Sequence, residues 1–325
     1  MHSASNGRRH LILAGAALAA QPSLFAQSAG YPSRPIRLVV PYPPGGGNDD
    51  VARILGDQLS RQVGQPVVID NRAGGSGTIA HTFVARAEPD GYTLLIDSSN
   101  IVMNPWLMRN VPVDVKELTP ITLAVKYSNM LLVHPSVPAR TTEEFIRHAR
   151  ANPGTINFGT SGKGSPANID LQIFMRRAGV NVVPIPYKGG GPATQALLAN
   201  EVQALFMAIT ALPYIRAGTL RALATLGDKR SALLPDLPTM AEAALPGFTS
   251  ETWMGFFAPP RTPAAITRLL QTELVKALAA PEVRNRLVEK NFEPVGSSAQ
   301  EFGAVVTADL ARYGAMFREL NIQPD

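Results

Sequence analysis

The sequence Pro-Tyr-Pro-Pro-Gly-Gly-Gly-Asn-Asp-Asp occupies residues 41–50 of this chain. An apolar, β-branched run at residues 36–40 precedes it and predicts a buried strand. In residues 51–59, which follow it, apolar side chains recur at helical spacing. Residues 41–50 are therefore predicted to form a loop that leads from a strand into a helix.

The composition of this loop is typical of an anion-binding site. Its glycines at 45–47 permit positive φ angles and let the backbone come close to a ligand. Asn48 or Asp49 can cap the helix, whose first N–H groups and dipole attract a negative charge. A capped turn that binds nothing would have the same residues, so both interpretations stay open.

A nucleotide is the weaker interpretation of the same loop. A Walker A sequence continues with Gly-Lys and then Ser or Thr, whereas Gly47 is followed by Asn48 and Asp49. Two adjacent carboxylates would also repel a polyphosphate. A small carboxylate held by backbone N–H groups fits the loop better.

The first 26 residues have the pattern of a secretory signal. Arg8 and Arg9 precede the apolar run at residues 11–20, and we expect cleavage after Ala26. The apolar run is too short to span a bilayer as a stable helix. We therefore expect an exported protein, which uses either the Sec route or the twin-arginine route.

Composition excludes several classes of function. Removal of residues 1–26 takes away two arginines and no acids, so the formal net charge falls from +5 to +3, which gives no case for nucleic acid. The chain has no cysteine, so it forms no disulfide and has no thiolate chemistry. The remaining length of about 300 residues predicts two domains.

The order of the predicted elements indicates an α/β fold with a mostly parallel sheet. Strands expected at residues 36–40, 65–70 and 92–97 alternate with helices. A loop rich in Gly, Ser and Asn follows each strand, and the third loop contains Ser99 and Asn100. Since ligands lie beyond the carboxyl ends of such strands, these loops should face one crevice.

The same order restarts after residue 128, so we assign residues 129–250 to a second domain. Residues 27–128 and 251–325 are assigned to the first domain, the latter with helices expected at 263–279 and 299–320. The chain thus crosses between domains near Ser128 and Ser250, and we expect these crossings to act as hinges.

The second domain offers further loops at the ends of predicted strands. Residues 160–166 and 187–192 are rich in glycine and should again attract an anion. A strand is also expected at residues 202–206, which places Met207 at its carboxyl end beside the 187–191 loop.

A rival motif lies at residues 75–80, which match G-x-G-x-x-A. Asp97 ends a strand about 20 residues later, as a dinucleotide fingerprint requires. Residues 71–74, however, separate the preceding strand from the first motif glycine, where the fingerprint has a tight turn. The alternative function is an exported NAD(P)-dependent oxidoreductase.

Residue patterns typical of catalysis are missing from the sequence. There is no G-x-S-x-G elbow, and His81, His134 and His148 are widely spaced without a metal-binding pattern. Asp49 and Asp50 are adjacent, so on a helix they point about 100° apart and cannot act face to face. We therefore expect no enzyme activity, no cofactor and no metal.

Short motifs spread over the mature chain resemble the tripartite tricarboxylate transporter receptor family, also called the Bug solute-binding proteins. The matching pieces occur in the family's order and cover essentially the whole mature chain. They are Tyr31–Ile36, Pro41–Asp49, Asn71–Arg72 with its glycines, Ala87–Leu95, Ser161–Pro166, Tyr187–Gly189, Ala217–Ala224, Leu237–Ala243 and Pro246–Phe248.

The resemblance implies a periplasmic receptor of the two-domain, Venus-flytrap, type II-like periplasmic-binding-protein class. Such a receptor has a mostly parallel sheet in each domain, closes its interdomain cleft on a small carboxylate, and can hand it to a membrane permease of the tripartite tricarboxylate type. We expect a monomer. With the strand-end loops, the expected ligand contacts are Tyr42, Pro43, Gly45, Gly46, Asn48, Asp49, Ser99, Asn100, Thr160, Ser161, Ser165, Asn168, Tyr187, Lys188, Gly189 and Met207.

Two of these residues depart from the family pattern. Asn168 stands where the family often has His, and Met207 where it often has an acid. A thioether pairs poorly with an ammonium group, and an amide cannot become cationic. We therefore expect a preference for carboxylates without an ammonium group, with aromatic or extended apolar carboxylates favoured over aspartate or glutamate.

Overall fold

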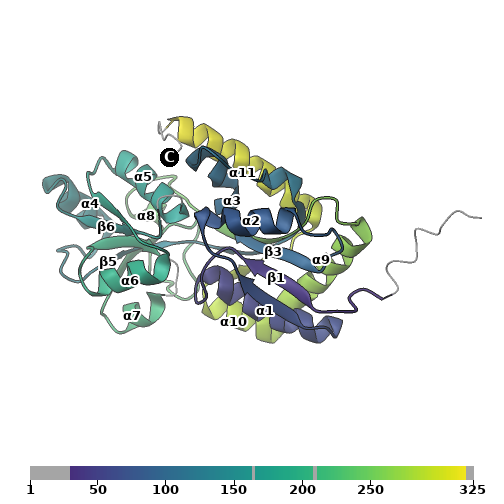
Figure 1. Cartoon of the computed structure of the whole chain (residues 1–325). Coiled ribbons are helices and arrows are strands. Elements are labelled where there is room, and N and C mark those ends of the chain that lie inside the picture. The colour runs from purple at the N-terminus through teal and green to yellow at the C-terminus, as the bar shows by residue number, and fades with distance from the viewer. Residues whose placement is uncertain (1–29, 163–164, 208–210, 320–325) are drawn as a thin grey trace, which may run out of the picture. The chain divides into compact units, whose positions relative to one another are not determined.

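The computed structural model describes residues 30–162, 165–207 and 211–319 of the 325-residue chain. The signal predicted at residues 1–26 lies outside the described residues. Residues 32–325 belong to one compact unit, and its described part contains two β-sheets. Figure 1 shows each sheet between layers of helices. In the described part of the chain, no helix is both long enough and apolar enough to cross a membrane.

The first sheet, with the helices that cover it, is called lobe A. Its strand order is β11-β4-β10-β3-β1-β2. Strands β1 to β4 point the same way, and β10 and β11 run against them. The bounds are β1 Ile36–Val40, β2 Val67–Asn71, β3 Thr93–Ser98, β4 Thr119–Tyr127, β10 Thr252–Ala258 and β11 Glu293–Pro294.

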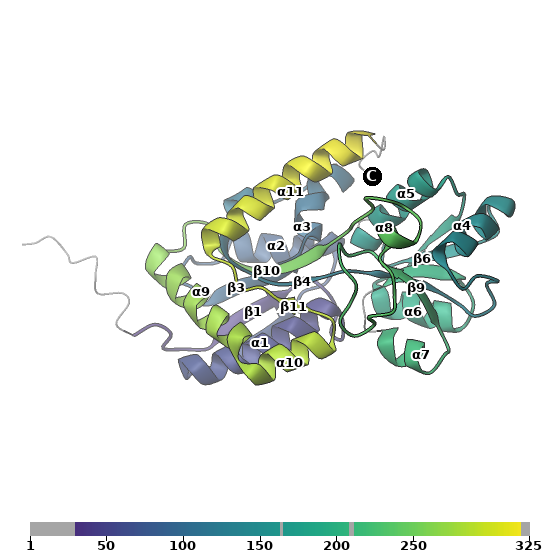
Figure 2. The same ribbon diagram turned by 180° about the vertical axis from the view of Figure 1, so that it is seen from behind.

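Helices cover both faces of the lobe A sheet, as the apolar strands require. On one face lie α1 (Gly47–Val63), α9 (Ala264–Ala279) and α10 (Pro281–Glu289), below the sheet in Figures 1 and 2. On the other face lie α2 (Thr78–Ala85), α3 (Asn100–Leu107) and α11 (Ala299–Glu319). Two 3₁₀ turns, η1 (Gly75–Gly77) and η2 (Val115–Glu117), lie in the connections.

The second sheet and its helices form lobe B. The strand order is β7-β6-β8-β5-β9, and only β5 runs against the other described strands. The strands are β5 Met130–Val133, β6 Asn157–Thr160, β7 Val183–Pro186, β8 Ala204–Met207 and β9 Arg221–Thr225. The helices are α4 Thr142–Ala151, α5 Pro166–Ala178, α6 Gly190–Leu198, α7 Leu212–Arg216 and α8 Met240–Ala243.

Aromatic side chains fill the core of each lobe. In lobe A the rings of Phe257 and Phe302 lie 4.9 Å apart between β10 and α11. Gly255 makes this approach possible, because a Cβ atom there would lie 2.1 Å from the Phe302 ring. In lobe B the rings of Phe158 and Phe206 lie 4.9 Å apart. Burial of each such ring stabilises the fold by about 2–3 kcal/mol.

Two segments carry the chain between the lobes. Ser128 and Asn129 connect β4 to β5, and the segment that ends at Glu251 leads into β10. Both segments bond to the backbone of Leu226: its N–H donates to Asn129 O at 2.8 Å, and Ser250 N–H donates to its carbonyl at 2.7 Å. The division into domains at 128 and 250, and the hinges there, remain predictions.

Candidate functional site

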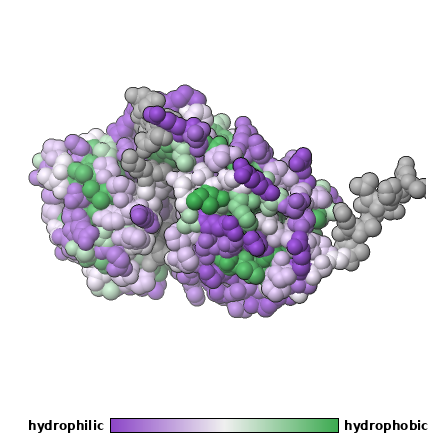
Figure 3. Space-filling model, in the orientation of Figure 1, coloured by the Kyte–Doolittle hydropathy of each residue, from purple (hydrophilic) through white to green (hydrophobic). Residues whose placement is uncertain are grey.

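Strand direction places the predicted ligand loops at one edge of each sheet. In lobe A the loops after β1 and β3 leave the carboxyl ends of parallel strands. In lobe B the loops after β6 and β7 and the end of β8 do the same. Met130, three residues after the end of β4, pairs with Met207 at the end of β8. The carboxyl ends of both sheets therefore lie close to the crossing segment Ser128–Asn129. Figure 3 shows the surface hollowed between the lobes.

Asp49 braces the loop of lobe A. Its side chain is only 4% exposed and accepts hydrogen bonds from Gly45 N (2.9 Å), Arg53 Nε (2.9 Å) and Asn71 Nδ2 (3.0 Å). Burial acts to raise the pKa of Asp49, but these hydrogen bonds outweigh it and lower the pKa. The carboxylate is therefore charged and fully engaged, which leaves only the backbone N–H of Asp49 for a ligand.

Tyr42 joins this loop to the neighbouring strand ends. Its carbonyl accepts from Asn71 Nδ2 at 3.0 Å, and its hydroxyl accepts from Asn100 Nδ2 at 2.6 Å. Burial, followed by the nearby Asp97 carboxylate, raises the pKa of Tyr42 well above its ordinary value. Its hydroxyl therefore stays protonated and fixes the position of Asn100.

Two helices that begin at the predicted ligand loops of lobe A have no side-chain cap. Helix α1 has Gly46 as N-cap and α3 has Ser99, and neither receives a side-chain hydrogen bond to its N–H groups. In α1 the first helical bond runs from Asp50 N to Gly46 O, so the N–H groups of residues 46–49 have no intrahelical partner. These groups are available to an anion. The N–H of Gly45 is not, because Asp49 accepts it.

In lobe B, helix α6 begins at a predicted ligand loop without a side-chain cap. Its N-cap is Gly189, again with no side-chain cap, and the exposed Lys188 precedes it. Helix α5, in contrast, is capped by Ser165, whose hydroxyl accepts from Asn168 N at 3.2 Å. The N–H of Ser165 donates to Gly162 O at 3.1 Å, so this donor, which we expected to bind the ligand, is already used.

Four buried polar atoms among the described residues lack a hydrogen-bond partner at these strand ends. They are Asn48 Oδ1, Ser99 Oγ, Asn100 Oδ1 and Thr160 Oγ1. Leaving such an atom unpaired costs about 1–3 kcal/mol, so unpaired atoms in a folded protein mark a place where something else can bind. Three of them belong to lobe A and one to lobe B.

The remaining residues expected at the site differ in exposure. Pro43, Gly45 and Gly46 are exposed, whereas Ser99 is fully buried. Ser161 and Tyr187 are partly exposed, and the pKa of Tyr187 is raised by burial and by Glu201. Met207 lies against the start of α6, because a Cβ atom on Gly190 would be 2.8 Å from its Cε.

The rival dinucleotide motif does not have the geometry of a fingerprint. Residues 75–77 form η1, and helix α2 starts only at Thr78. Asp97, which would have to reach a ribose, is fully buried, and its carboxylate is held by His81 Nε2 at 2.6 Å and by Ser98 N at 2.7 Å. The structure therefore does not favour the nucleotide interpretation.

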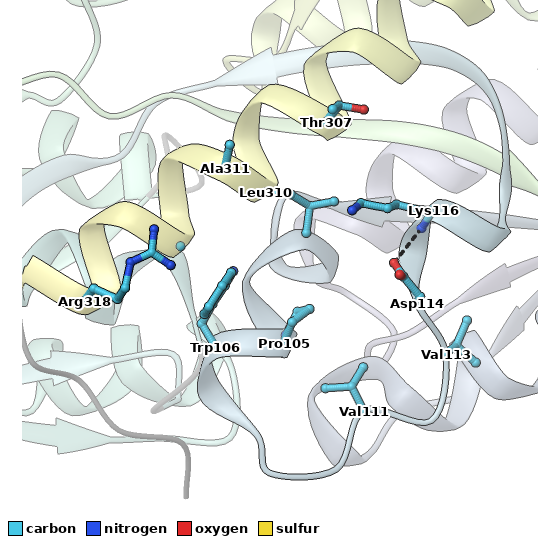
Figure 4. Close-up of a pocket in the computed structure, with 11 residues that line it drawn as sticks. Pro105, Trp106, Val111, Val113, Asp114, Lys116, Thr307, Leu310, Ala311 and Arg318 are labelled. Atoms are coloured by element: carbon cyan, nitrogen blue, oxygen red, sulfur yellow. Dashed lines mark hydrogen bonds between the residues drawn. The ribbon is translucent and has the colours of Figure 1, made fainter.

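A hollow of about 620 Å³ lies elsewhere in lobe A, between α3 and α11. Figure 4 shows Trp106 from α3 and Leu310 from α11 on its walls. It is lined by none of the residues predicted for the ligand site, and it lies among the covering helices rather than at the strand ends. Size alone therefore does not identify the functional site.

Sequence reasoning did not assign a site role to Asn71 or Arg53, which hold Asp49 in place. The signal that could have found Arg53 is its spacing of four residues from Asp49 on a predicted helix. Asn71 ends the neighbouring strand β2, and parallel pairing with β1 brings it opposite Val40. Its role follows only from the strand order.

Comparison with known proteins places this geometry in a family. Residues 51–322 match the profile of the Tripartite tricarboxylate transporter family receptor. The chain belongs to this receptor family. Among its relatives, Protein BugT of Bordetella pertussis is 36% identical over 293 residues, which cover 89% of this chain and 90% of BugT.

Solved structures confirm the fold of this family member. The periplasmic binding protein BugD has a TM-score of 0.85 at 31% identity, with 91% of this chain and 100% of BugD covered. An R. palustris protein solved with adipate has a TM-score of 0.87 at 33% identity, with 91% of this chain and 100% of that protein covered. The two-domain, mostly parallel α/β receptor fold predicted from the sequence is therefore correct.

Proposed function

We propose that this protein is an exported solute-binding receptor that captures a small carboxylate between lobes A and B. The observation that carries the proposal is the arrangement of uncapped helix N-termini, α1 and α3 in lobe A and α6 in lobe B, at the carboxyl edges of the sheets. Free N–H groups and helix dipoles at such an edge bind an anion without needing a fixed cation.

The charged groups near these loops support a carboxylate over a more highly charged anion. Asp49 is neutralised by Arg53, and Lys188 is exposed in lobe B. A polyphosphate would need several cations, whereas one or two carboxylates can be held by backbone N–H groups. The relative that was solved with adipate binds a ligand of this chemistry.

We further propose that the ligand has no ammonium group. Met207, at the end of β8, lies against the first turn of α6, and its thioether cannot pair with a cation. Asn168 stands in the first turn of α5 and adds no charge. Extended apolar or aromatic carboxylates should therefore bind better than aspartate or glutamate.

We also propose that the ligand is passed to a permease of the tripartite tricarboxylate type after export to the periplasm. The family's name and the periplasmic neighbour BugD support this. Closure requires the ligand to contact both lobes, because contacts with one lobe alone give no differential free energy for closing. The crossings at Ser128–Asn129 and Ser250 would then be the hinges.

The test is the identity of the small molecule that the purified protein carries. Denaturation followed by mass spectrometry should release a carboxylate that lacks an amine. Small-angle scattering of the protein saturated with the released carboxylate should give a smaller radius of gyration than that of the ligand-free protein. Release of a nicotinamide dinucleotide, or a thermal shift with NAD or NADP, would contradict the proposed receptor function.

A further inference from the structure

Asp170 is a buried acid that the ligand site does not use. It lies on α5 of lobe B and is 4% exposed. Asn129 Nδ2 donates to its Oδ2 over a long 3.4 Å, and the Ser250 hydroxyl also donates to the carboxylate. Asn129 and Ser250 are the residues of the two crossing segments that bond to Leu226. One carboxyl group therefore contacts both connections between the lobes.

Asp170 also faces a small cavity that both lobes enclose. The cavity measures about 150 Å³ and is lined from lobe B by α5 and residues 247–250. From lobe A it is lined by Met103 of α3 and by Arg312, Tyr313 and Met316 of α11. A change in the angle between the lobes must change this cavity, and with it the access of water to Asp170.

The charged and titratable groups around Asp170 do not neutralise it. On α11, Arg312 is paired with Asp309 at 3.0 Å, and burial, before other causes, raises the pKa of Tyr313 to about 12. On α5, Arg177 donates to the carbonyl of Pro246. Tyr127, at the end of β4, is also held protonated, because burial raises its pKa. The two crossing segments contribute only the neutral side chains of Asn129 and Ser250.

We propose that the protonation state of Asp170 controls the arrangement of the two lobes through its contacts with both crossing segments. Its uncharged carboxyl group stabilises the lobe arrangement seen here, and its ionisation favours an arrangement in which water reaches the carboxylate. The receptor's opening equilibrium would then respond to pH independently of the ligand. This inference needs two lobes that move, but it does not depend on which solute the receptor binds.

The direction of the pH response follows from burial. Burial raises the pKa of Asp170 to about 6, although the hydrogen bonds from Ser250 and Asn129 and the charge of Arg312 act against it. In a hydrated arrangement the pKa would fall towards the ordinary value of about 4. As the pH rises from about 4 through 6, the lobe equilibrium should therefore shift towards the hydrated arrangement, by at most about 100-fold for a difference of two pKa units.

The lobe equilibrium can be measured without any ligand. The chain has no cysteine, so Glu88→Cys on lobe A and Glu143→Cys on lobe B, both exposed, give two unique spin-label positions. Pulsed electron–electron double resonance should show a change in the distance distribution as the pH rises from about 4 to about 8, with most of the change between about pH 4 and pH 6. In Asp170→Asn the low-pH distribution should persist at every pH.

Two further variants make the result decisive. Asp236→Asn removes an exposed acid of lobe B and should titrate like the parent protein. Ser250→Ala keeps Asp170 but removes a donor to its ionised form, so the midpoint should move to higher pH. A distance distribution that does not change with pH, or that changes equally in Asp170→Asn, overturns the proposal. Loss of solute binding in a protein whose lobes still respond to pH would instead count against the proposed receptor function alone.

Discussion

The two halves of the candidate site are built differently. In lobe A the loop after β1 is locked by hydrogen bonds between side chains and backbone: Asp49 binds Gly45, Arg53 and Asn71, and Tyr42 binds Asn71 and Asn100. In lobe B the loop before α6 consists of Tyr187, Lys188 and Gly189, with Met207 lying against the start of the helix. The loop before α1 is preorganised, whereas the loop before α6 is open.

This difference indicates an order of events. A rigid set of N–H groups in lobe A can bind the first carboxylate with little loss of conformational entropy. The looser N-terminus of α6 can then adapt to the rest of the ligand as the lobes close. Lobe A would thus supply the affinity common to carboxylates, and lobe B would discriminate among them.

Removal of the brace should have the largest effect. Asp49→Ala leaves the Gly45 N–H without its acceptor and removes one of the two acceptors of Asn71 Nδ2. It should lower the free energy of unfolding by about 2–4 kcal/mol, with binding lost as well. Urea denaturation measures the change. Asp50→Ala is the matched control: among the described residues its carboxylate pairs only with Lys290, whose side chain is 43% exposed, so its cost should be below about 1 kcal/mol. Equal costs for the two variants would mean that Asp49 does not brace the loop.

Asp170 of lobe B should behave in the opposite way to Asp49. Asp49 is held charged, whereas the folded protein binds a proton at Asp170 more tightly than the unfolded chain does. Stability should therefore fall as the pH rises from about 4 through 6. At pH 8 the free energy of unfolding of Asp170→Asn should then exceed that of the parent by about 1–3 kcal/mol, which raises its melting temperature. At pH 4 the two proteins should unfold at similar temperatures. A stability gain that is the same at both pH values would contradict this.

Gly46→Val tests whether the preorganised loop touches the ligand. Gly46 has extended backbone angles, φ −92° and ψ 171°, and a Cβ atom there would meet only Pro43 O at 3.9 Å. The fold should therefore tolerate valine, while affinity for carboxylates should fall at least about tenfold, since the added bulk stands where the ligand approaches. Calorimetric titration and thermal melting separate the two effects. A drop in melting temperature that matches the loss of affinity would show a purely structural loop.

Met207→Asp tests whether lobe B selects among carboxylates, and it should give the smallest effect of these variants. An acid beside Gly190 could pair with an ammonium group, so amino acids should gain affinity relative to the matched carboxylates by about tenfold or less. Met207→Leu, which keeps an apolar side chain, should leave this ratio unchanged. Competition between adipate and 2-aminoadipate measures the ratio in each variant. An unchanged ratio in Met207→Asp would remove Met207 from the specificity argument.

The sequence predicted the architecture well because apolar periodicity and glycine-rich strand ends are local signals. It missed α3 and α10, which begin directly after other elements: α3 follows β3 through Ser99, and only Ala280 separates α10 from α9. Both helices were missed because the sequence did not show where the preceding element ends and the helix begins.

The site was harder to predict from sequence than the fold. The loops could be found from strand ends, but which N–H groups remain available depends on contacts distant in sequence. Asn71 reaches Asp49 across 22 residues. The N–H groups of Gly45 and Ser165 looked available in the sequence and are used inside their own loops. Such competition is set by loop geometry, which composition does not encode.

The most direct test of the account is a thermal-shift panel on the ligand-free parent protein. It should contain adipate, aromatic carboxylates, the matched amino acids 2-aminoadipate, aspartate and glutamate, and NAD and NADP. A ligand that binds the folded state raises stability by RT ln(1 + [L]/Kd), so the shifts rank affinities. We predict that an amine-free carboxylate gives the largest shift and that NAD and NADP give none. A largest shift from an amino acid would contradict the predicted ligand class, and one from a nicotinamide dinucleotide would contradict the receptor itself.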